Sequence, residues 1–142
     1  MKPIDLAIAD YVYFNCFDGS KIIVKITAIN NNGLVYGVSE YGSHWCNIDK
    51  VEPIPFAPEI LEKNEFETTP SSWEIEINNI AIVIVKKQDD YLLSISEPYC
   101  DGIAKGYHWV FHDLTINHVH QLQHSLRLCG LNDKADNFKL EE

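Results

Sequence analysis

Residues 116–131 carry the most regular pattern of apolar and polar positions in the chain. Apolar side chains recur there at helical spacing, at Ile116, Val119, Leu122, Leu126 and Cys129. Thr115 is placed to cap the helix N-terminus, and Gly130 followed by Leu131 is typical of a helix that ends in a left-handed residue with an apolar contact beyond it. The pattern predicts an amphipathic helix with one face packed on a core and the other face in water.

The first half of the chain contains short alternating segments that are typical of β-strands. These segments are residues 11–16, 21–29, 34–38 and 45–48. Asp18 and Gly19 favour a tight turn after the first segment, and residues 30–33, which end in glycine, favour a second reversal. Such strands predict a small SH3-like β-barrel, because closing the sheet removes exposed strand edges.

Residues 51–58 mark a boundary, because they hold three prolines, which cannot continue a strand ladder. We expect this segment to form an extended strap in which Ile54 and Phe56 pack as an apolar clasp. Pro58 is expected to open a short helix. The chain is thereby divided into two modules, residues 1–57 and 58–142.

Strand patterns return in the second half of the chain. The segments are residues 73–77, 80–85, 91–96 and 107–111. Residues 80–85 are apolar throughout, so we expect a central strand that is covered on both sides. Alternation along the last segment predicts that Tyr107, Trp109 and Phe111 share one face, whereas His108 and His112 share the other. The expected fold class is α+β, with an antiparallel sheet covered by one C-terminal helix.

The charge of the chain disfavours one broad class of function. The formal net charge is −10, from 21 acidic and 11 basic residues, and no basic patch is apparent. Binding to nucleic acid is therefore not expected, although mimicry of nucleic acid stays open if the carboxylates form rows. The sequence shows no membrane span, no secretion signal and no closely spaced cysteines, so we expect a cytoplasmic protein with reduced thiols and no cofactor.

His120 and His124 are candidate metal ligands, because residues four apart lie on one face of a helix. A zinc site needs further ligands, and the glutamate of a zincin motif is missing here. We therefore interpret both histidines as part of the wet face of the helix, with metal binding as the alternative. His108 and His112 beside Asp113 are candidates for proton transfer, but no nucleophile accompanies them.

Three short motifs resemble an uncharacterised family of small proteins that is common in gut Bacteroidetes genomes and in their phages and mobile elements. The motifs are residues 5–12, 54–66 and 119–123. The resemblance implies a phage or mobile-element setting and no established activity. Ala9 and Glu65 stand where the family has glycine, so we expect Asn64 to take the left-handed position after the short helix. The family has asparagine at the position of His124, so a metal-binding pair is not a family property.

We expect a non-enzymatic protein-interaction module, because no catalytic constellation assembles in the sequence. Residues 97–106 are expected to form a long loop, and binding residues often gather on loops. The candidate binding residues are Tyr99, Lys105, Tyr107, His108, Trp109 and His112. The aromatic candidates for interface hot spots are Tyr36, Tyr41, Trp45, Tyr99, Tyr107 and Trp109, most of which we expect in the core. The alternative function is small-molecule binding or weak catalysis in a cleft between the modules that involves His108 and His112. Self-association stays open.

Overall fold

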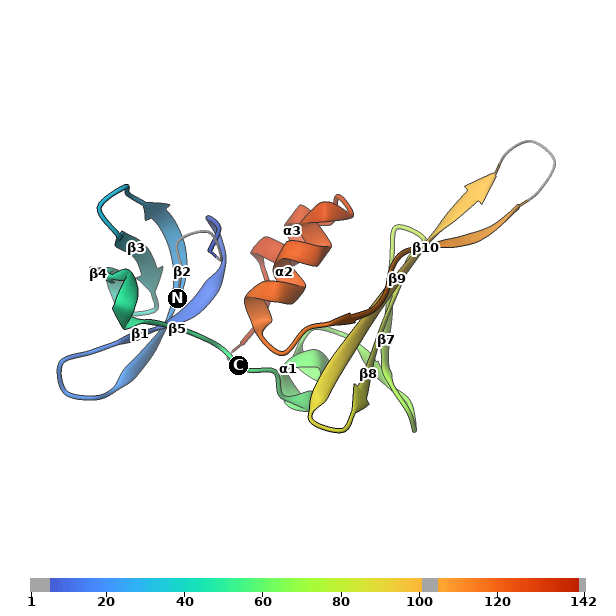
Figure 1. The fold of residues 1–142 in the computed structure, drawn as a ribbon, viewed down its shortest axis with the longest axis horizontal. Coiled ribbons are helices and arrows are strands. Elements are labelled where there is room, and N and C mark those ends of the chain that lie inside the picture. The colour runs from blue at the N-terminus through green and yellow to red at the C-terminus, as the bar shows by residue number, and fades with distance from the viewer. Residues whose placement is uncertain (1–5, 101–104, 141–142) are drawn as a thin grey trace.

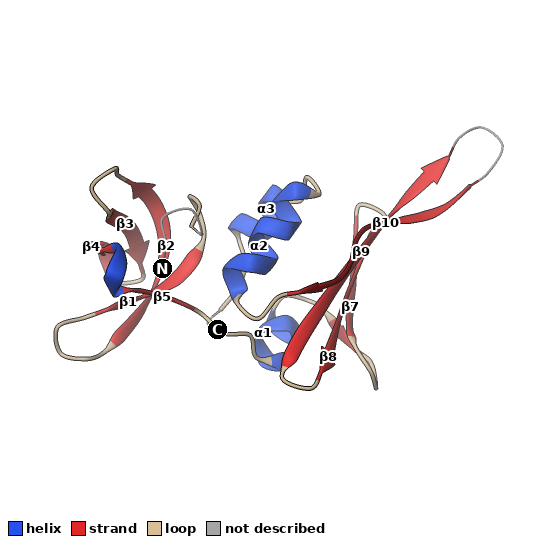
Figure 2. Cartoon of the chain, viewed as in Figure 1, coloured by secondary structure: helices blue, strands red, loops and turns tan. Residues whose placement is uncertain are grey.

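The chain folds into three layers, with helices packed between two β-sheets (Figure 1). The structure is a computed structural model that describes residues 6–100 and 105–140. The N-terminal part of the chain forms one sheet and the middle part forms the other, whereas the C-terminal helices lie between them (Figure 2).

The N-terminal sheet has antiparallel strands in the order β4-β3-β2-β1-β5. Their bounds are β1 (Tyr11–Asn15), β2 (Lys21–Ile29), β3 (Leu34–Ser39), β4 (Gly42–Asn47) and β5 (Val51–Pro53), with the 3-10 helix η2 (Ile48–Lys50) before β5. Both predicted turns are confirmed, since Gly19 and Gly33 have φ values of 85° and 81°. Left-handed backbone of this kind favours glycine, because glycine has no Cβ to clash.

This sheet is not closed into a barrel in the part of the chain that the structure describes. β4 and β5 lie at its two edges and do not pair with each other. β4 also begins at Gly42 rather than at residue 45, because the preceding turn falls on Glu40 and Tyr41. One side of the sheet buries a small core of its own, formed by Leu6, Val12, Phe14, Val24, Ile26, Val35 and Val51.

The C-terminal sheet is also antiparallel, in the order β10-β9-β8-β7-β6. Its strands are β6 (Glu67–Thr68), β7 (Trp73–Ile77), β8 (Ile80–Lys87), β9 (Asp90–Cys100) and β10 (Lys105–Thr115). β8 is central, as predicted, and Ile82 and Ile84 on its inner side are buried, but Val85 on its outer side is exposed. The prediction that both sides of this strand are covered is therefore wrong, because the helices pack on one face of the sheet only (Figure 2).

Three α-helices lie in the described ranges: α1 (Pro58–Lys63), α2 (Val119–Leu128) and α3 (Asn132–Asp136). Pro58 occupies the first turn of α1, as predicted. The predicted end of α2 is also confirmed. Gly130 has a φ of 78°, and its N–H donates to Arg127 O at 3.0 Å, while Leu131 N donates to Leu126 O at 2.9 Å.

Two helix boundaries differ from the prediction. α2 begins at Val119 and not directly after Thr115, because β10 continues to Thr115. Gln121 Oε1 then accepts the two backbone N–H groups just ahead of α2, at 2.8 and 3.1 Å. After α1, the left-handed backbone falls on Glu65, with a φ of 71°, whereas Asn64 has a φ of −100°. The buried Asn64 amide instead holds the backbone of the C-terminal tail through two contacts of 2.7 Å.

The larger core lies between the C-terminal sheet and the helices. Its buried residues are Ile54, Phe56, Leu61, Phe66, Ile82, Ile84, Tyr91, Leu93, Ile95, Ile116, Val119, Leu122, Leu126, Leu131, Ala135 and Phe138. The predicted clasp of Ile54 and Phe56 is confirmed, and Tyr11, Tyr13 and Ile23 of the N-terminal sheet pack against this core from the opposite side. The module boundary at residue 57 stays a prediction. No helix in the described ranges has the length and apolar character needed to cross a bilayer.

The polar side of α2 is not in water, contrary to the prediction. Gln123 is fully buried and His120 is 5% exposed, because this side packs against the segment that leads into β1. Gln123 Oε1 accepts a hydrogen bond from Tyr11 N at 2.9 Å, and Nε2 donates to Ala9 O at 3.1 Å and to Ala135 O at 2.8 Å. One side chain therefore ties the N-terminal sheet to both C-terminal helices.

Asp10 extends the same interface with a buried charge. Its carboxylate accepts hydrogen bonds from His124 Nε2 at 2.7 Å, Arg127 Nη1 at 2.6 Å and Ala7 N at 2.8 Å. Arg127 Nε also donates to Asp136 Oδ1 at 3.1 Å. A carboxylate can stay buried when it is paired and hydrogen-bonded in this way. These contacts fix how α2 sits against the N-terminal sheet.

Candidate functional site

β9 and β10 form a hairpin that projects beyond the rest of the C-terminal sheet (Figure 1). β8 follows β9 as far as the pair Ala81–Ser96, whereas β9 and β10 stay paired to Cys100–Lys105. The predicted loop at residues 97–106 is therefore wrong at residues 97–100, 105 and 106, because β9 extends to Cys100 and β10 begins at Lys105; residues 101–104 lie outside the described part of the chain. We call the part that is paired beyond β8 the arm, which is residues 97–100 and 105–108. A two-stranded ribbon is only marginally stable alone in water, so contact with another surface would stabilise the arm.

A bulge in β10 changes the predicted faces of this strand. The register shifts between Trp109 and Phe111. Phe111 packs against the larger core, whereas Trp109 lies on the outer side of the sheet and its ring centroid is 4.6 Å from that of His112. The prediction that Trp109 shares a face with Phe111, and His108 with His112, is therefore wrong. The extra residue in the bulge reverses the alternation that follows it.

Several aromatic side chains that we expected in the core lie on the surface instead. The exposed fractions are 38% for Tyr36, 76% for Tyr41, 65% for Trp45, 65% for Tyr107 and 55% for Trp109. The side chains of Tyr99 and Lys105 lie outside the described residues. The expectation of a mostly buried set is wrong, because no described element covers these parts of the two sheets. Tyr107 and Trp109 thus form an exposed aromatic pair on the arm and at its base.

The two candidate histidines of β10 do not act together. His108 Nε2 lies 2.8 Å from Oε1 of Glu97, its partner across the arm. His112 Nε2 lies 3.6 Å from Asp113 Oδ2, and both of these side chains are more than half exposed. His108 and His112 point to opposite sides of β10, so the structure does not assemble them into a proton-transfer pair.

A hollow of about 340 Å³ lies where the N-terminal sheet meets the C-terminal tail. Its walls include Tyr11, Ile23, Lys25, Val38 and Phe138. Neither His108 nor His112 lines this hollow. The cleft that the alternative function requires is therefore not built from the residues that the sequence suggested.

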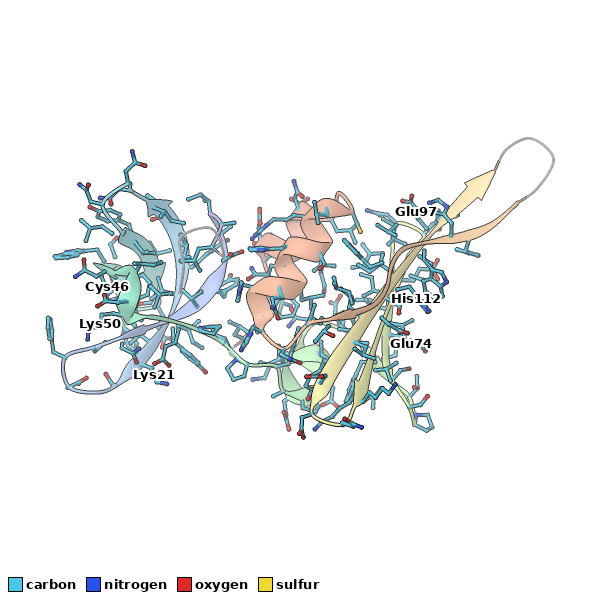
Figure 3. The ribbon with its side chains drawn as sticks, in the orientation of Figure 1. Lys21, Cys46, Lys50, Glu74, Glu97 and His112 are labelled. Carbon is cyan, nitrogen blue, oxygen red and sulfur yellow. The ribbon has the colours of Figure 1, made fainter. Side chains whose placement is uncertain are left out.

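The outer side of the C-terminal sheet is organised in rows that cross from strand to strand. Directly opposite residues in a ladder point to the same side. One row is Trp109, Ser96, Ala81 and Glu76, and the next is Ser94, Val83, Glu74 and Glu67. A hollow of about 500 Å³ opens over β7 and β8 on this side. Figure 3 shows His112 and Glu74 on the side of the sheet that faces away from α2.

A further hollow, of about 590 Å³, opens in the N-terminal sheet. The exposed side chains of Phe17 and Trp45 line it together with Cys16 and Cys46, which is labelled in Figure 3. Burial raises the pKa of Cys46 to about 11, helped by the nearby Asp49 and Cys16. A thiol with such a high pKa is a poor nucleophile at neutral pH, so Cys46 is not an activated cysteine.

His120 and His124 lie on the side of α2 that packs against the segment before β1, where His120 is buried and the side chain of His124 is 35% exposed. The ring of His120 stacks on that of His118, with centroids 6.0 Å apart, and meets the ring of His124 edge-on at 5.5 Å. His124 is itself bound to Asp10. Within residues 6–100 and 105–140, no group of three histidine, cysteine, aspartate or glutamate side chains is arranged to hold a metal ion.

Sequence reasoning missed the residues that join the two sheets, which are Asp10, Gln123 and Arg127. The backbone partners of Gln123 on the N-terminal segment are 112 and 114 positions away in the sequence. No local pattern can therefore mark this contact, although Gln123 lies within one of the three short motifs. Comparison of the chain with family models, with curated proteins and with solved structures finds no match.

Proposed function

We propose that the chain is a non-enzymatic, cytoplasmic protein-interaction module whose contact surface is centred on the arm and the base of β10. The observation that carries this proposal is the exposure of Tyr107 and Trp109, at 65% and 55%. Tyrosine and tryptophan dominate interface hot spots, because they bury a large area and lose little side-chain entropy on binding.

Two further features support a protein partner. Within residues 6–100 and 105–140, no third strand lies beside the arm, so a partner would add the packing that the ribbon lacks. The net charge of −10 opposes attraction to nucleic-acid phosphates. Self-association through this surface belongs to the same proposal, since a second copy is also a protein partner.

The proposal extends to the type of N-terminal module and to its setting. An SH3-like origin of the N-terminal sheet is supported by β5, which returns to pair with β1 after the meander of β1 to β4. A phage or mobile-element setting rests on the resemblance described above. It is supported by the left-handed backbone of Ala9 and Glu65, at φ values of 72° and 71°, because these are the two positions where the family has glycine.

Capture experiments with immobilised protein test the proposal. We expect the double variant Tyr107→Ala with Trp109→Ala to lose the partner that the parent chain retains from a lysate of its own host cells. The matched control is Tyr41→Ala, which removes an exposed aromatic residue at the turn before β4. Equal recovery of the partner by all three proteins would contradict the proposal.

A further inference from the structure

The outer side of the C-terminal sheet carries long side chains on β10 and β7 and short side chains between them, and we call this surface the trough. Trp109 and His112 on β10 form one wall, and Glu74 and Glu76 on β7 form the other. The floor between the walls is made of the short side chains of Ser96, Ala81 and Val83. Ser94 continues the row, but it is buried and hydrogen-bonded to Asp113. In the described part of the chain, no helix or strand covers this floor (Figure 2). A sheet with an uncovered apolar strip can bury it by accepting another layer.

The distance between the walls of the trough matches the diameter of a single α-helix. β10 and β7 are separated by three strand-to-strand steps, and each step is about 4.8 Å, which places the walls roughly 14 Å apart. An α-helix with its side chains is about 10–12 Å in diameter. An added strand would need an edge of the sheet and not its face. A second sheet would collide with the Trp109 wall, which stands above the floor.

The glutamate side chains of the acidic wall favour a positively charged helix. Glu67 and Glu74 face each other directly across β6 and β7, and like charges in that arrangement repel. Neither of these residues nor Glu76 forms an ion pair with a basic side chain among the described residues. A lysine or arginine above them would therefore relieve an existing repulsion. Trp109 on the opposite wall can also take a cation over its ring.

We propose that this trough binds a basic amphipathic helix of a partner protein. The apolar face of the helix lies on Ala81 and Val83, and its lysine or arginine side chains reach Glu74 and Glu76. The inference rests on the proposed function in one respect, since it names the kind of partner that an interaction module with Trp109 in its surface would take. Binding of the helix to the trough does not involve the arm, which begins after Ser96.

A synthetic peptide tests the inference directly. The probe is a peptide of leucine and lysine in an amphipathic helical repeat, and its binding to the full chain is measured by titration calorimetry. We expect binding at a ratio of one to one that weakens as salt is added. A scrambled peptide of the same composition separates helical amphipathicity from charge alone, and a leucine and glutamate peptide of the same repeat reverses the charge.

Variants of the chain locate the binding site. Glu74→Gln combined with Glu76→Gln should weaken binding of the probe roughly tenfold, because two favourable ion pairs are lost. Glu40→Gln combined with Glu59→Gln removes the same charge from exposed positions elsewhere and should leave the affinity within about twofold of the parent. Ala81→Phe, which fills the floor, should abolish binding while circular dichroism stays unchanged.

Three results would overturn the inference: equal binding of the scrambled peptide, equal effects of the two glutamate pairs, or unaltered binding by folded Ala81→Phe. If Ala81→Phe does not fold, the inference is tested by comparing the probe affinities of the two double glutamate variants. Tyr107→Ala separates this inference from the proposed function, because Tyr107 lies on the arm outside the trough. Loss of partner capture by Tyr107→Ala without any effect of Glu74→Gln and Glu76→Gln would refute the trough and leave the proposed function in place.

Discussion

Replacing Gln123 by leucine should cost more stability than any surface change in α2. The side chain is fully buried and makes three hydrogen bonds to backbone groups, of Tyr11, Ala9 and Ala135. Leucine has a similar volume but leaves one N–H and two carbonyl groups without a hydrogen-bond partner. Each unpaired buried polar group lowers the free energy of unfolding by about 1–3 kcal/mol. After allowance for the added apolar burial, we expect a loss of roughly 3–5 kcal/mol, a large share of the total stability of a domain.

Urea denaturation followed by tryptophan fluorescence and by circular dichroism measures this loss. We also expect the two probes to give separate transitions in the Gln123→Leu variant, because the N-terminal sheet loses its tie to α2 and α3. Leu128→Ala is the control, since Leu128 is on the same helix and is 75% exposed; its effect should stay below about 0.5 kcal/mol. A loss of less than 1 kcal/mol in Gln123→Leu would refute the reasoning.

Three more predictions concern backbone strain, packing and thiol chemistry. Ala9→Gly and Glu65→Gly should each raise stability by about 0.5–1 kcal/mol in thermal unfolding, because both positions have left-handed backbone; a lower melting temperature would contradict this. Gly37→Ala should lower stability by about 2–3 kcal/mol, since the new Cβ would overlap Val24 Cγ1 and lie 2.8 Å from a carbonyl oxygen; a silent substitution would show that the strands can separate there. Cys46, with a pKa raised to about 11 from 9.0, should react with iodoacetamide near pH 8 about 100-fold more slowly in the folded chain than in urea; mass spectrometry that finds equal rates would contradict that burial.

Features set by neighbouring residues could be predicted from the sequence. The end of α2 at Gly130 and Leu131 depends on backbone hydrogen bonds within one helical turn. The turn at Gly19 and the first turn of α1 at Pro58 are equally local. Each follows from steric limits on a few residues, so no knowledge of the rest of the fold is needed.

Features set by distant partners could not be predicted. Nothing near His120 or Gln123 in the sequence signals that this side of α2 packs against residues more than 100 positions away. The polar side chains of α2 therefore predicted a solvent-exposed face. The bulge after Trp109 is a second example, because it depends on the pairing of β10 with β9. It places Trp109 and Phe111 on opposite faces of the sheet, although strict alternation predicted a shared face.

Site-specific photo-crosslinking tests the interaction surface most directly. A benzophenone amino acid is placed at Tyr107 in one protein and at Tyr41 in another, and each is irradiated in living host cells. We predict a discrete covalent adduct with a partner protein or a second copy from the Tyr107 position, and little or none from Tyr41. An adduct from Tyr41 alone, or no adduct from Tyr107, would contradict the placement of the contact surface on the arm.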